Sequence, residues 1–135
     1  MKWLILCVIM AAVITAHAQE EKVNRFRTES VATKFYNKEK KWTRWQDLPN
    51  SKNVLLTFDG VKNNLTVFSP KKMTFYFTTI TKDIELEDDN VRLTEFNCID
   101  MDGGEYTGTQ IIHNGVYNLY LQQSNFEMRF IFRKI

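Results

Sequence analysis

The chain has 135 residues, of which 44% are hydrophobic, and its 18 basic and 16 acidic side chains give a formal net charge of +2. This near balance of charge excludes a general nucleic-acid-binding protein and a polybasic anchor for anionic membranes. The length suits one globular domain with a hydrophobic core.

The first 18 residues have the pattern of a cleavable signal peptide. Lys2 gives a positive start, residues 3–15 form an almost unbroken apolar run, and residues 16–18 (Ala-His-Ala) present the small residues that a signal peptidase accepts. The run of about 13 residues is shorter than the roughly 20 that a membrane-crossing helix needs. We therefore expect residues 1–18 to be removed. Residues 19–135 would then be a single β domain without a membrane span, exported to the periplasm or secreted.

The mature segment 19–135 keeps one cysteine. Residues 1–18 contain one basic residue and no acid, so the mature net charge is +1. Cys98 has no partner for an internal disulfide, and the core and the strand pairing must stabilise the domain alone. We expect its thiol to be a buried hydrophobe, with an intermolecular disulfide as the alternative.

Apolar residues in the mature segment recur at every second position. Near the C-terminus Phe126, Met128, Phe130 and Phe132 alternate with polar side chains, and only Ile131 breaks the alternation. This period predicts strands with one buried face. With the turns between them, the predicted extended segments are Phe26–Tyr36, Lys41–Asp47, Asn53–Phe58, Leu65–Phe68, Met73–Ile80, Val91–Met101, Glu105–His113, Val116–Gln122 and Phe126–Arg133.

The connections between these segments are short and contain Asp-Gly and Asn-Gly pairs, which favour tight hairpins. They are too short for parallel crossovers, so we predict an all-β fold: a single antiparallel meander of about eight strands. A small up-and-down barrel or a strongly curled sheet is favoured, because an open sheet would expose an apolar face and two edges. A two-layer β-sandwich is the alternative. The acidic stretch Thr81–Asn90 is predicted to be an exposed loop.

Two acidic segments are candidate cation sites. Asp83–Asp89 contains five carboxylates, and Asp100–Asp102 precedes a glycine turn. Carboxylates that converge on a glycine turn can supply calcium ligands, although the full twelve-residue calcium loop is absent. Asp before Gly is also a common turn sequence, in which the carboxylate accepts backbone N–H bonds. We interpret both segments as structural and predict no metal.

The segment from Lys34 to Trp45 mixes basic and aromatic residues, a combination that can stack on sugars or bases. Trp42 and Trp45 are three positions apart, so in a regular strand their rings point to opposite faces. We therefore expect one ring in the core, the other at the surface, and a hairpin with a solvated basic face.

Catalytic and modification motifs are sparse. Cys98 and His113 lie on neighbouring predicted strands and could form a minimal thiol–imidazole pair, but His113 precedes an Asn-Gly turn and is expected in water. Two such ligands are also too few for the usual zinc site. Asn64-Leu65-Thr66 matches the N-glycosylation pattern. We predict no catalytic, cofactor-binding or metal-binding residue, and no enzyme activity.

Several strand and turn segments carry a resemblance to a known family. They are Trp42–Trp45 (Trp-Thr-Arg-Trp), Asn53–Asp59, Leu65–Ser69 and Cys98–Gly103. Together they resemble a family of short exported proteins of unknown function from Gram-negative bacteria. Members often carry a second cysteine after the Asp-Gly turn, where this chain has Tyr106, so the family's disulfide is not expected here. The resemblance implies an exported, compact domain and no particular activity.

These observations favour a non-catalytic exported binding or structural module whose partner is a protein or a small apolar ligand. One alternative is a carrier of small hydrophobic ligands with lipocalin-like architecture, since an eight-stranded barrel has room for side chains or one small ligand. The other is an inhibitor or partner-binding protein that acts through surface loops. The deciding observation is whether the barrel encloses an apolar cavity or a packed core.

Overall fold

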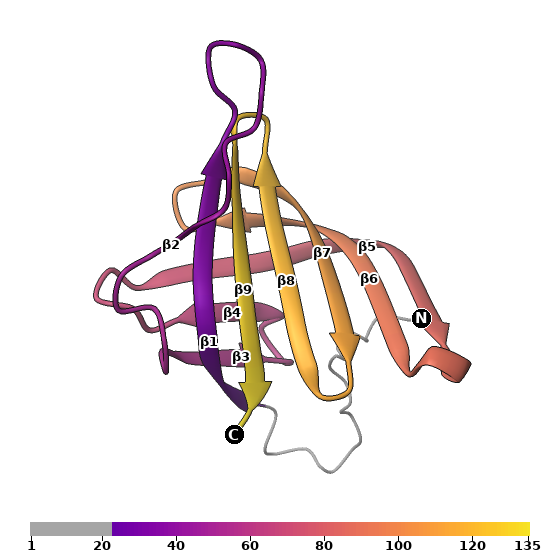
Figure 1. The fold of residues 1–135 in the computed structure, drawn as a ribbon. Helices are drawn as coiled ribbons and strands as arrows, with labels where there is room; N and C mark the ends of the chain where they lie inside the picture. Colours follow the sequence, from indigo (N-terminus) through magenta and orange to yellow (C-terminus); the bar gives the residue numbers. More distant parts are fainter. Residues whose placement is uncertain (1–22) are drawn as a thin grey trace.

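The structure, a computed structural model, describes residues 23–135. The predicted signal peptide (residues 1–18) lies outside them. The described chain forms one antiparallel sheet, which closes into a barrel because β9 pairs with β1 (Figure 1). The strands are β1 (Val23–Phe35), β2 (Gln46–Asp47), β3 (Leu55–Asp59), β4 (Asn64–Val67), β5 (Met73–Leu86), β6 (Val91–Asp100), β7 (Glu105–His113), β8 (Val116–Gln123) and β9 (Phe126–Lys134). A single 3-10 turn, η3 (Glu87–Asp89), joins β5 to β6.

The predicted antiparallel meander is confirmed. From β3 onward each strand pairs with the next along the chain, and β1 bridges the two ends by pairing with β3 and β9. Val31 of β1 lies opposite Phe130 of β9, and Phe26 lies opposite Leu56 of β3. Eight strands therefore form the barrel wall, and the short β2 is an extra strand that pairs only with β1. The fold is a barrel and not a sandwich.

The side chains that were predicted to point inward fill the barrel. Phe130 and Phe132 are buried at 0% and 2% exposure, as the alternation of the last strand requires. The rings of Phe75 in β5 and Phe130 in β9 meet edge to face at 6.5 Å between centroids. Side chains from these two strands, which are not neighbours in the sheet, therefore contact each other inside the barrel. The buried core comprises Phe26, Val31, Leu56, Phe58, Leu65, Val67, Phe75, Phe96, Cys98, Leu119, Leu121, Met128, Phe130 and Phe132.

The predicted strand Lys41–Asp47 is wrong over most of its length. Only Gln46 and Asp47 pair with β1, and one isolated bridge joins Tyr36 to Trp42. Lys40 has a positive φ of 62° in the turn that precedes the segment, and between Trp42 and Gln46 the segment leaves the regular ladder. Residues 36–48 run back along the edge of β1, where Thr43 and Leu48 donate backbone N–H bonds to Phe35 and Val31.

At Thr81–Asn90 the predicted exposure is confirmed, but the predicted loop is wrong. β5 continues to Leu86 and pairs with β6 down to the Leu86–Val91 pair, so most of the acidic stretch is strand. The pairing is interrupted at Thr78 and at Thr81, where the register shifts by one residue. Such bulges bend a strand and increase its twist. The end of the β5–β6 hairpin therefore bends away from β3 and β4 and, with η3, forms the lower right of Figure 1.

Candidate functional site

Large side chains of the described residues occupy the axis of the barrel. Leu56, Phe130 and Leu121 are completely buried, the ring of Phe75 in β5 meets that of Phe130 in β9 across the axis, and Phe26 packs against Phe132 on the neighbouring strand. One depression at the surface, of about 740 Å³, lies over the ends of β6, β7 and β8 and presents amides and hydroxyls such as Asn97, Thr107 and Gln122. The candidate site described below lies on the outer surface.

The thiol of Cys98 is buried in the core at 1% exposure. Burial, and secondarily the negative charge of Asp100, raise the thiol pKa to about 12. Cys98 pairs with Tyr106, whereas His113 lies at the other end of β7, about 23 Å away at 3.3 Å per residue. The thiol–imidazole pair is therefore not formed, and the expected buried cysteine is confirmed.

We expect Cys98 to react slowly with Ellman's reagent at pH 8 in the folded protein and rapidly in 6 M guanidinium chloride. The thiol loses its proton in the unfolded chain near pH 8.5 but in the folded protein only near pH 12. Folding stability should therefore fall as the pH rises above about 8.5. A Cys98→Ala variant should lose part of this pH dependence. Rapid labelling of the folded protein would contradict the burial.

Asp100 is a turn residue and not a metal ligand. Its Oδ1 accepts the backbone N–H groups of Asp102 at 2.9 Å and Gly104 at 2.8 Å, and its Oδ2 accepts the hydroxyl of Tyr106 at 3.1 Å. These bonds, with the Gly104 N–H first, lower the pKa of the Asp100 carboxyl. Gly103 has a φ of 86°, as the Asp-Gly sequence predicts.

The two acidic segments lie along different parts of β6: Asp83, the nearest residue of the first, pairs with Thr94, which is about 20 Å from Asp100 at 3.3 Å per residue, so the segments cannot share a cation. Asp83 is held on the inner face of β5 by Arg92, which donates from Nε at 3.1 Å and from Nη2 at 2.8 Å, and by the hydroxyl of Thr94 at 3.2 Å. The carboxylate in turn raises the pKa of Arg92. Within residues 23–135, no three His, Cys, Asp or Glu side chains are arranged to hold a metal ion.

Trp42 and Trp45 lie on the same side of the sheet, so the expectation of one core ring and one surface ring is wrong. The ammonium of Lys34 lies 5.2 Å from the centroid of Trp42 and 4.7 Å from that of Trp45, and Arg129 covers Trp45 at 4.7 Å. Lys34 also pairs with Glu127 at 3.5 Å. Both rings share a face because the segment is not a regular strand. Through Lys34 and Arg129 they fix residues 36–48 to the barrel.

Asn64 is the first residue of β4 and is buried at 9% exposure between Asp59 and Tyr76 on the neighbouring strands. A glycan is bulky and requires a surface position. The folded barrel therefore has no room for a sugar at the predicted acceptor.

The feature that sequence reasoning missed is an open sheet edge. β4 pairs with β5 only from Met73 to Tyr76, and Asn63 extends the contact by one residue through two bonds to Phe77. Beyond Phe77, no strand within residues 23–135 pairs with this side of β5. After the second bulge the strand is regular over Lys82–Leu86, which we call the β5 edge. The alternation of Asp83 and Glu85 with Ile84 and Leu86 is the feature of the sequence from which this strand could have been predicted.

Comparison with protein-family models, curated proteins and solved structures found no match to this chain. In the part of the chain that the structure describes, there is also no helix with the length and apolar character to cross a membrane. The candidate site therefore rests on the geometry of the β5 edge and the outer face of the barrel.

Proposed function

We propose that the protein is an exported, non-catalytic binding module that recognises its partner on the outer surface of the barrel. The filled interior carries this proposal. Phe75, Phe130 and Phe132 occupy the axis at exposures of 2% or less, which leaves their places unavailable to a small apolar ligand. The signal-peptide pattern of residues 1–18 and the resemblance to exported proteins support a location outside the cytoplasm.

The surroundings of the titratable candidates support a non-catalytic role. The Cys98 thiol is neutral at physiological pH and has no histidine beside it. The Asp100 and Asp83 carboxylates are occupied by backbone, tyrosine, arginine and threonine donors. A hydrolase needs a nucleophile, a base and an orienting group in contact, and these residues are distributed over separate ends of the sheet.

The proposal predicts that the folded protein does not bind 1-aminoanthracene, a fluorescent probe of apolar barrel cavities. The tryptophans are unsuitable reporters because Trp42 and Trp45 lie outside the barrel. A Leu121→Ala variant tested with benzene serves as the control for a small cavity, because truncation of a completely buried leucine leaves a space that a molecule of this size can enter. Saturable one-to-one binding of the probe by the unaltered protein would instead favour the hydrophobic-ligand carrier.

A further inference from the structure

We propose that the β5 edge (Lys82–Leu86) binds an extended peptide segment in which basic and aliphatic residues alternate, by adding it to the sheet as a further strand. The inference rests on the proposed function, since it names the surface and the chemistry of the partner. It begins from the backbone. On one side Lys82–Leu86 pair with β6, and on the other their N–H and C=O groups face no strand of residues 23–135.

The structure explains why this edge is open. The bulges at Thr78 and Thr81 turn β5 away from the direction of β4, whose pairing ends at Tyr76. The barrel closes through the first half of β5, and the second half extends past it as the outer strand of the β5–β6 hairpin. An open row of backbone groups is a template for pairing with another chain.

The side chains of the edge specify what the added strand must carry. On one face of the sheet the Asp83 carboxylate is already bonded to Arg92, which leaves Glu85 as the carboxylate of the edge that a partner can contact. Ile84 and Leu86 lie on the other face at 42% and 52% exposure. Because side chains alternate along a strand, a partner needs a basic residue opposite Glu85 and an aliphatic residue on each side of it.

The aliphatic side chains on this outer face continue onto the neighbouring strands. Ile84 lies opposite Leu93, and Leu93 lies opposite Ile111 of β7, so one row of aliphatic residues crosses three strands. Leu86 lies opposite Val91 in the next row. An alternative role for charged side chains on an edge strand is to prevent association with other chains. A purely protective edge would not also expose two aliphatic side chains beside a half-buried apolar strip.

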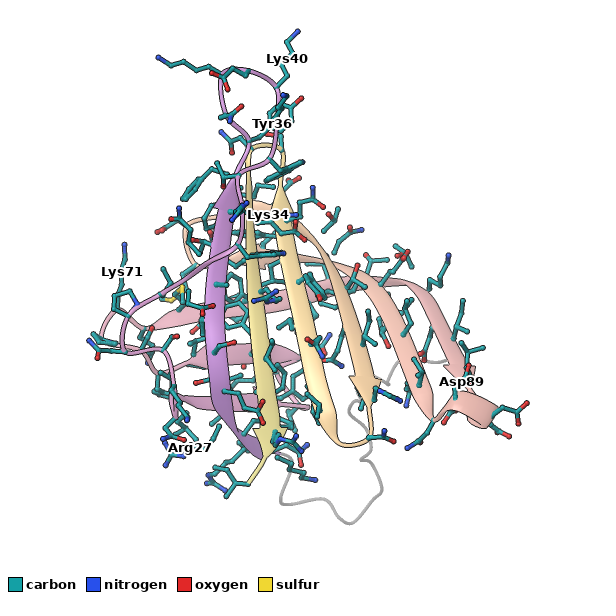
Figure 2. All side chains as sticks on the ribbon, in the orientation of Figure 1. Arg27, Lys34, Tyr36, Lys40, Lys71 and Asp89 are labelled. Atoms are coloured by element: carbon teal, nitrogen blue, oxygen red, sulfur yellow. The ribbon has the colours of Figure 1, made fainter. Side chains whose placement is uncertain are left out.

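The charge at this end of the molecule favours a basic partner over a second copy of the chain. Glu85, Glu87, Asp88 and Asp89 gather at the end of the hairpin, and the four ion pairs among residues 23–135 use none of them. Figure 2 shows Asp89 at the far corner from Lys34 and Lys40. Two copies joined edge to edge with Ile84 opposite Ile84 would place Asp83 of each copy against Glu85 of the other, and like charges directly opposite are destabilising.

The test uses the folded protein and two fluorescein-labelled heptapeptides in 0.15 M NaCl, at which surface attraction is screened beyond about 8 Å. One peptide alternates four lysines with three valines, and the other has the same composition as four lysines followed by three valines. We expect the alternating peptide to bind about tenfold more tightly in fluorescence anisotropy. On binding, amide hydrogen exchange should slow within residues 82–86.

Variants separate strand addition from simple charge attraction. Glu85→Lys should weaken the alternating peptide about tenfold, whereas Glu87→Lys, which makes the same change in charge in η3 beyond the strand, should weaken it less than about threefold. Ile84→Ser should weaken binding and Val61→Ser, at an exposed turn position, should not. Circular dichroism checks that each variant is folded. If a lysine variant does not fold, the comparison of Ile84→Ser with Val61→Ser still tests the β5 edge.

Equal affinity for the two peptides, or equal losses in Glu85→Lys and Glu87→Lys, would overturn the inference in favour of non-specific attraction. Self-association in sedimentation experiments that Glu85→Lys abolishes would overturn it in favour of a second copy. These outcomes leave the proposed function intact, because that proposal fails only if an apolar probe enters the barrel of the unaltered protein.

Discussion

Phe130→Ala is expected to lower the free energy of unfolding by about 3–5 kcal/mol, the usual cost of removing a buried phenylalanine ring from a packed core. Phe130 is completely buried, lies opposite Val31 of β1 and Leu119 of β8, and meets the ring of Phe75 across the barrel. Its loss leaves a cavity at the strands that close the barrel. Urea denaturation followed by circular dichroism measures the change.

Phe68→Ala is the matched control, since it removes the same side chain from a position that is 45% exposed. The Phe68 ring contacts the ammonium of Lys72 at 5.6 Å, an interaction that contributes about 0.5–1 kcal/mol at exposed sites. We expect the control to cost no more than about 1 kcal/mol. Equal destabilisation by the two variants would contradict the assignment of the barrel interior.

Gly108→Ala is expected to destabilise the fold by about 1–3 kcal/mol through a steric conflict. Gly108 lies on the inner face of β7 opposite Phe96 of β6, and a Cβ atom there would overlap the far edge of the Phe96 ring. The ring cannot move aside freely, because Phe96 is 5% exposed and packs against Phe77 at 4.8 Å between centroids. The glycine is therefore required by the space that the ring occupies.

A double-mutant cycle with Phe96→Leu tests this explanation. The shorter leucine removes the ring atoms that conflict with the new methyl group, so Gly108→Ala should cost much less in the Phe96→Leu background. We expect a coupling of about 1 kcal/mol or more, which exceeds the usual additivity error of about 0.3–0.5 kcal/mol. Additive effects would show that the glycine is needed for another reason, such as backbone flexibility.

The errors in the sequence-based prediction have two physical causes. Thr81–Asn90 was predicted to be a loop because of its many acidic residues, in spite of the alternating Ile84 and Leu86. Charged side chains are, however, tolerated on an open strand edge that faces water. At Lys41–Asp47 a strand was inferred from its place in the meander. The contacts of both tryptophans with Lys34 hold this segment on the outside of the barrel, out of the regular ladder.

The sequence by itself determined which residues face inward and where the hairpins turn. Alternation in Phe126–Arg133 and the Asn114-Gly115 turn are local properties, set by the two-residue period of a strand and by the positive φ that such turns require. Only the tertiary structure decided the closure of the barrel and the open β5 edge. Closure depends on the pairing of Phe26 with Lys134, far apart in the chain, and the open edge depends on where the β4–β5 pairing ends at Tyr76; a local pattern encodes neither.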